Sequence, residues 1–104
     1  MTREELGGNI VLSNFDLDIP EKTIVRKLVG KYAEKIRNST EFQELKLELK
    51  KHQKQDKESF EINVHLTADG RDFSSESQGL NVFVCIDESL KKIIQEVKNK
   101  ELIK

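Results

Sequence analysis

Residues 60–73 read FEINVHLTADGRDF. Apolar side chains occupy every second position from Phe60 to Leu66, and polar side chains lie between them, which predicts a strand with one buried face. The dipeptide Asp69-Gly70 follows, and this pair favours a tight type I′ turn. The segment therefore predicts a β-hairpin whose second strand covers residues 71–76.

Two more strands are predicted before this hairpin. Leucines alternate with charged residues at positions 45, 47 and 49, so residues 44–50 should form a strand with one buried face. The polar and basic residues 51–57 are expected to form the loop that follows it. The short apolar run at residues 9–12, which reads NIVL, predicts the first strand of the chain.

Two amphipathic helices complete the pattern. The first should cover about residues 20–37, with Pro20 in its first turn, where the missing N–H is harmless. The second follows a turn at residues 77–81, and Asn81 is suited to be its N-cap. Each helix has one apolar stripe, formed by Ile24, Val25, Leu28, Val29, Tyr32, Ala33 and Ile36 in the first and by Val82, Phe83, Ile86, Leu90, Ile93, Ile94 and Val97 in the second.

These elements predict an α+β domain with the order β-α-β-β-β-α. The connection through the first helix should be a right-handed crossover that makes the first strand parallel to its neighbour. We expect a four-stranded sheet with both helices packed on one face. Residues 1–8 are expected to be a flexible lead, residues 9–100 a single domain and residues 101–104 a frayed C-terminus.

The composition narrows the functional classes. The chain has 104 residues, of which 36% are charged, and its net charge is −1. No apolar run approaches the roughly 18 residues that a membrane span needs, and the N-terminus has no apolar segment typical of a secretory signal. Cys85 is the only cysteine, which excludes an internal disulfide and fits a reducing cytoplasm. We therefore expect a cytoplasmic protein with no membrane partner.

Signatures of catalysis are weak. The chain has no phosphate-binding loop and no dinucleotide-binding glycine pattern. His52, His65 and Cys85 are too few and too scattered for a structural zinc site. Cys85 lies at the edge of an apolar helix stripe, where a cysteine usually packs, and the alternation places His65 on an exposed strand face. We expect no enzyme activity, no cofactor, no metal and no small-molecule substrate.

The basic residues are unevenly distributed. Residues 20–57 hold eleven bases against six acids, a balance of +5. The outer side of the first helix carries bases, as does that of the last helix, and the loop at residues 51–57 adds more. Such fixed charges suit contacts with nucleic-acid phosphates, although a merely solvated helix face would have the same composition. The candidate binding residues are Arg26, Lys27, Lys31, Arg37, Lys91 and Lys92, with Lys50, Lys51 and Lys54 as a weaker extension.

Two segments resemble a known family. Residues 19–36 read IPEKTIVRKLVGKYAEKI, and residues 81–93 read NVFVCIDESLKKI. Together with the element order, they resemble the ribosome hibernation-promoting factors, also described as ribosome-associated inhibitors of translation. The most specific agreement is in the last helix, at Phe83, Ile86, Asp87, Lys92 and Ile93.

The resemblance implies a function and a partner. It implies a short form of the family that binds the rRNA of the small ribosomal subunit through bases on both helices and inhibits translation during slow growth. The nine candidate bases would then be rRNA contacts. The alternatives are a protein-binding module that uses the exposed sheet face, a double-stranded RNA binder and a small enzyme that uses Cys85.

Overall fold

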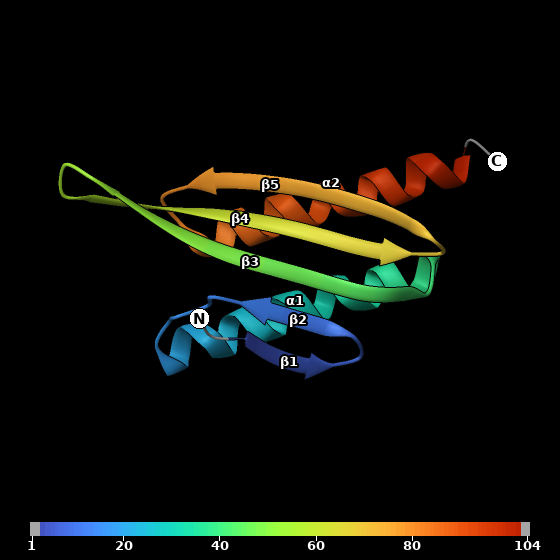
Figure 1. Cartoon of the computed structure of the whole chain (residues 1–104), viewed down its shortest axis with the longest axis horizontal. Coiled ribbons are helices and arrows are strands. Elements are labelled where there is room, and N and C mark those ends of the chain that lie inside the picture. Colours follow the sequence, from blue (N-terminus) through green and yellow to red (C-terminus); the bar gives the residue numbers. More distant parts are fainter. Residues whose placement is uncertain (1–2, 103–104) are drawn as a thin grey trace.

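The computed structural model describes the backbone of residues 3–102 and the side chains of residues 3–100. Its elements are β1 Arg3–Gly7, β2 Ile10–Ser13, α1 Ile19–Ser39, β3 Phe42–Lys54, β4 Lys57–Ala68, β5 Arg71–Gly79 and α2 Val82–Leu102. The strands form one sheet in the order β1-β2-β3-β4-β5 (Figure 1). Strands β2 and β3 are parallel, as predicted for the crossover through α1, and the other neighbours are antiparallel.

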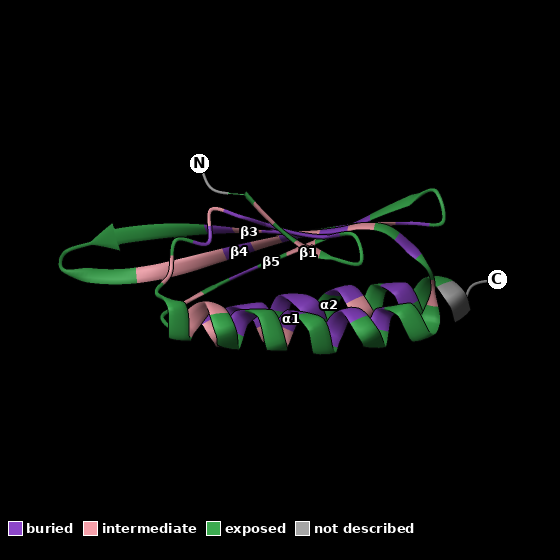
Figure 2. Cartoon of the chain, turned by 90° about the horizontal axis from the view of Figure 1, so that it is seen from below, coloured by how far each residue is buried: buried purple, intermediate pink, exposed green. Residues whose placement is uncertain are grey.

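Both helices cover one face of the sheet, and the opposite face is open (Figure 2). They run in the same direction, because both begin at the end from which the β3–β4 hairpin projects (Figure 1). Leu47 of β3 and Val64 of β4 share one core with Val29 of α1 and Ile86 of α2, and each of these residues is almost completely buried. The predicted α+β class and the predicted placement of the helices are confirmed.

The sheet has five strands where the sequence predicted four, because residues 3–7 of the expected flexible lead form the edge strand β1. Residues 7–9 all have positive φ, of 82°, 58° and 65°, and they turn the chain back into β2. Leu6 packs against the core, and Glu4 pairs with Arg26 of α1 at 2.8 Å. The acidic segment has low strand propensity, so β1 depends on partners that are remote in the sequence.

The predicted loop at residues 51–57 is also different in the structure. Strands β3 and β4 remain paired as far as Lys54 and Lys57, and the turn contains only Gln55 and Asp56. Both faces of this part of the hairpin are exposed, so no alternation of apolar and polar residues could indicate a strand. The hairpin projects from the body (Figure 1), and the longest extent of the chain is 48 Å.

The local signals at the other turns and helix ends agree with the structure. Asp69 and Gly70 have φ of 53° and 71°, as a type I′ turn requires. The Oδ1 atom of Asn81 accepts from the backbone N–H of Phe83 at 2.9 Å, which confirms it as the N-cap of α2. At the start of α1, Asp18 forms a capping box with Glu21.

The chain ends fall partly outside the described residues. Of the four C-terminal residues expected to fray, residues 101 and 102 still belong to α2. Residues 103–104 lie outside the described part of the chain, as do residues 1–2 of the expected lead.

No helix between residues 3 and 102 is both long and apolar enough to span a membrane.

Candidate nucleic-acid interface

The two helices pack side by side along a line that we call the helix seam. Its central contact is a hydrogen bond from the Tyr32 hydroxyl of α1 to the Asp87 carboxylate of α2. Lys91 lies one turn after Asp87 and pairs with the same carboxylate at 3.0 Å. The packed apolar stripes therefore stabilise the seam on its core side, and Tyr32, Asp87 and Lys91 stabilise it at the surface.

The pKa values of the two residues in this contact are shifted in opposite directions, upward for Tyr32 and downward for Asp87. Burial raises the pKa of Tyr32 to about 12, and the hydrogen bond to Asp87 adds to the increase. The hydrogen bond from Tyr32 lowers the pKa of Asp87, and Lys91 lowers it further. Asp87 therefore stays charged at neutral pH and Tyr32 stays neutral, so the hydroxyl remains a donor.

The pKa of Tyr32 can be measured directly, because the chain has one tyrosine and no tryptophan. We expect absorbance at 295 nm to titrate with a midpoint of about 12 in the folded chain, against about 10 in urea. Because the folded pKa is raised, Tyr32 should stabilise the fold fully below pH 10, and this contribution should disappear as the pH rises to about 12. The variant Asp87→Asn should titrate lower, and a native midpoint near 10 would contradict the buried hydrogen bond.

Five lysines lie along the exposed shoulders of the seam, and we call them the seam lysines. Their spacing places them there, since residues four or seven apart share one helix face. Lys31 and Lys35 lie over the Tyr32 ring, with Nζ 5.4 Å and 5.2 Å from its centroid. The seam lysines are Lys27, Lys31 and Lys35 on α1 and Lys91 and Lys98 on α2.

Of the residues predicted from the sequence, Lys31 and Lys91 have contacts at the seam, with Tyr32 and Asp87 respectively. Helix spacing places Lys27 one turn before Lys31 on the same side of α1. Lys35 and Lys98 were not among the predicted residues. The step of four from Lys31 to Lys35 could have indicated the first of them. Lys98 could have been found in the same way, seven residues after Lys91.

The two predicted arginines lie on the other flank of α1, which faces the β1–β2 hairpin. Arg26 pairs with Glu4 at 2.8 Å, and this contact is the main cause that lowers the pKa of Glu4. Arg37 donates a hydrogen bond to the carbonyl of Gly8 and covers the ring of Phe42, 4.9 Å from its centroid. Both guanidinium groups therefore attach β1 and its turn to the body.

The other predicted bases also lie away from the seam. Lys92 donates to the backbone carbonyl of Glu76 at 2.9 Å, so it reaches the β5 edge of the sheet. Lys51 donates to the backbone carbonyl of Asp16 at 2.7 Å. Lys50 and Lys54 belong to the projecting part of the β3–β4 hairpin.

The residues considered for catalysis have ordinary structural surroundings. Cys85 is buried in α2, and burial raises the pKa of its thiol, which disfavours the reactive thiolate. His65 is exposed and lies 3.3 Å from Asp72. Within residues 3–100, no three side chains of histidine, cysteine, aspartate or glutamate are grouped so that they could hold a metal ion.

The open sheet face is organised around Glu61. Its carboxylate accepts hydrogen bonds from Asn63 at 2.7 Å and Gln78 at 2.9 Å, and His52 lies 3.1 Å away. The hydrogen bonds from Asn63, Gln78 and His52 lower the pKa of Glu61 to about 2. The polar groups around Glu61, near the end of this face from which the β3–β4 turn projects, are therefore engaged with one another.

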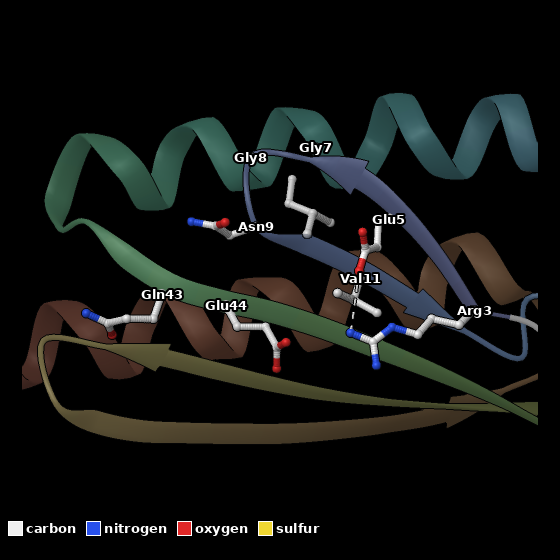
Figure 3. Close-up of a pocket in the computed structure, with 9 residues that line it drawn as sticks. Arg3, Glu5, Gly7, Gly8, Asn9, Val11, Gln43 and Glu44 are labelled. Carbon is white, nitrogen blue, oxygen red and sulfur yellow. Dashed lines mark ion pairs between the residues drawn. The ribbon is translucent and has the colours of Figure 1, made fainter.

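A polar hollow lies beside the turn between β1 and β2 (Figure 3). It has a volume of about 270 Å³ and is lined by residues 7–11, with Gln43 and Glu44 of β3 on its other side. Arg3 and Glu5 form an ion pair of 3.7 Å across it, and both side chains are well exposed. The charges of Arg3 and Glu5 are therefore paired with each other and exposed to water.

Comparisons with known proteins identify the fold. No family model matches the sequence, and the search of curated proteins finds no match either. Among solved structures, the chain is similar to the crystal structure of the N-terminal domain of Protein Y from Thermus thermophilus. The alignment covers 85% of this chain and 92% of that one, with a TM-score of 0.62 and 16% sequence identity. The chain therefore has the fold of that domain.

Proposed function

We propose that the chain is a non-enzymatic factor that binds the rRNA of the small ribosomal subunit through its helix seam. Bound there, it would exclude messenger and transfer RNA by occupying their path, and so inhibit translation when growth slows. The observation that carries the proposal is the row of seam lysines along two parallel helices. From β2 onward, the elements follow the order on which the family resemblance rests, which supports the proposal, as does the fold shared with the N-terminal domain of Protein Y.

The chemistry of the seam suits a phosphate backbone rather than individual bases. Lysine is a flexible point charge with three donors, and it contacts phosphate oxygens without reading sequence. Tyr32, the aromatic ring beside Lys31 and Lys35, is buried and so cannot stack on a base. The seam is therefore suited to recognise the shape and charge of folded RNA.

The charge balance of the two helices favours α1 as the main contact. Residues 19–39 carry six bases and two acids, whereas residues 82–102 carry four of each. On α2, Asp87 partly neutralises Lys91. We therefore propose that Lys27, Lys31 and Lys35 contribute most of the affinity and that Lys91 and Lys98 contribute less.

Replacing these three lysines tests the proposal. The variant Lys27→Gln/Lys31→Gln/Lys35→Gln should bind purified small subunits about 100-fold more weakly at low salt. The salt slope, which is the slope of log K against log salt concentration, should become smaller in magnitude by about three, because each lysine accounts for roughly one phosphate contact. Glutamine is a good helix former, so α1 should stay folded. Binding is measured by co-sedimentation over a range of protein concentrations.

A control variant removes the same charge elsewhere. Arg3→Gln/Lys46→Gln/Arg71→Gln neutralises three bases in β1, on the open sheet face and beside the β4–β5 turn. It should bind nearly as tightly as the unmodified chain. Equal weakening of both triple variants would show that net charge alone matters, and unchanged binding of the α1 variant would refute the seam as the interface.

A further inference from the structure

The projecting part of the β3–β4 hairpin, residues 50–58, is here called the arm. Every residue in it is exposed. Its two strands nevertheless remain paired residue by residue, from Lys50 opposite Glu61 to Lys54 opposite Lys57. The arm is therefore an ordered β-ribbon and not a loose loop, and it extends beyond the core at the end where both helices begin (Figure 1).

The two faces of the arm differ in charge. Alternation along β3 places Lys50, His52 and Lys54 on one face, and Lys57 joins them because it lies directly opposite Lys54. By the same alternation, the opposite face carries Lys51, Gln53 and Glu58. We call the first of these the basic face of the arm, because its strand positions carry three lysines and a histidine. Asp56 lies in the turn at its tip.

The tip of the basic face is electrostatically unfavourable in the isolated chain. Lys54 and Lys57 are directly opposite each other, and like charges in that position repel. Within residues 3–100, neither forms an ion pair with an acid, whereas Lys50 and His52 at the root lie 4.0 Å and 3.1 Å from Glu61. Lys54 and Lys57 thus form no ion pair with any described residue, and together with Asp56 of the turn they give the tip a local charge of +1.

The backbone conformation of the tip is also energetically unfavourable. Gln55 and Asp56 form the turn with φ of 49° and 65°, a region that side chains with a Cβ seldom adopt. The arm gains no core burial in return, since all of its residues are exposed. The root, in contrast, is anchored by Lys51, whose Nζ donates to the carbonyl of Asp16 at 2.7 Å. The arm is therefore attached to the body at its root, and its tip projects beyond the core (Figure 1).

We propose that the arm is a second RNA-binding element, in which Lys54 and Lys57 contact phosphates of the same rRNA that the helix seam binds. This inference rests on the proposed function and adds a site to it. Two linked contacts bind more tightly than either one, because the second forms at the high effective concentration that the first creates. The arm would therefore increase affinity and set the orientation of the domain on the RNA.

The composition of the arm favours RNA over an acidic protein. Residues 50–58 contain no phenylalanine, tyrosine or tryptophan and no aliphatic side chain. Protein interfaces owe most of their affinity to such buried anchors. Phosphate contacts require only fixed positive charges. A two-stranded ribbon that presents paired lysines supplies these charges and little else.

A pair of variants with equal net charge tests the inference. Lys54→Gln/Lys57→Gln removes two charges from the basic face, whereas Arg3→Gln/Arg71→Gln changes the net charge by the same amount outside the arm. The first should bind small subunits about 10-fold to 100-fold more weakly, with a salt slope smaller by about two. The second should bind nearly as the unmodified chain does. The urea midpoint of the first should be unchanged or higher, because it removes a repulsive pair.

The possible outcomes separate the arm from the seam. If the unmodified chain binds small subunits and the two double variants have the same affinity for them, the arm is not a contact, and the proposed function stands. If the unmodified chain does not bind small subunits at all, the proposed function is wrong, and this inference is overturned with it. Protein-free rRNA of the small subunit is the second probe. Weakening on intact subunits but not on that rRNA would overturn the assignment of RNA as the partner of the arm.

Discussion

The affinity for small ribosomal subunits should fall by about three to four orders of magnitude when the monovalent salt concentration rises from about 50 to about 200 mM. This expectation takes each of the five seam lysines and the two lysines of the arm tip to contact one phosphate. Each contact releases about 0.7 to 0.9 counterions, so about seven contacts give a slope of roughly −5 to −6 in log K against log salt. Co-sedimentation at constant magnesium would measure this slope.

The size of the slope distinguishes the functional classes. The net charge of the chain is only −1, so a steep slope would have to come from local contacts and not from overall attraction. A protein-binding module that used the open sheet face should lose little affinity, since the charges around Glu61 are already engaged within that face. A slope shallower than about −2 would contradict an RNA interface built from seven lysines.

Truncating the centre of the core should give the largest loss of stability. Leu66 lies in β4, completely buried, with Leu45 and Phe73 as its neighbours in the adjacent strands. The variant Leu66→Ala should lower the free energy of unfolding by about 3 kcal/mol, because the lost apolar contacts and the cavity left behind both cost energy. That corresponds to a factor of roughly 150 in the folding equilibrium, measured by urea denaturation.

The same substitution at an exposed leucine provides the control. Leu80 precedes α2 and is 73% exposed. The variant Leu80→Ala should change the free energy of unfolding by less than about 0.5 kcal/mol. Similar losses for the two variants would contradict the position of Leu66 at the centre of the core.

Most of the fold could be predicted because its elements bury one face. The alternation at residues 44–50 and 60–66 and the apolar stripes of both helices follow directly from burial on one side, and the structure agrees with them. The exception is Ile24, which was predicted in the stripe of α1 and is 48% exposed. Strand β1 and the arm could not be predicted in this way. Leu6 alone of the β1 side chains packs against the core, and neither face of the arm is buried.

The candidate interface was only partly predictable for a related reason. The sequence shows that Arg26, Lys31 and Arg37 belong to one helix, but not which flank of that helix meets which neighbour. Contacts with β1 and its turn engage both arginines, whereas Lys31 remains at the seam beside Tyr32. Lys92 and Lys91 are adjacent in the sequence, yet one reaches β5 and the other pairs at the seam.

The sequence by itself determined the strands with one buried face, the two helices, the N-cap of α2, the turn at Asp69-Gly70, and the excess of positive charge on α1. These features depend on interactions between residues close together in the chain, so periodicity and local propensity reveal them. Only the tertiary structure decided that a charged N-terminal segment is a strand, that the arm is an ordered ribbon, and which bases remain available to a partner. Strand β1 and the engagement of the arginines depend on contacts between segments far apart in the sequence, which no local pattern encodes. The arm is a local hairpin, but both of its faces are exposed, so no apolar alternation indicates its strands.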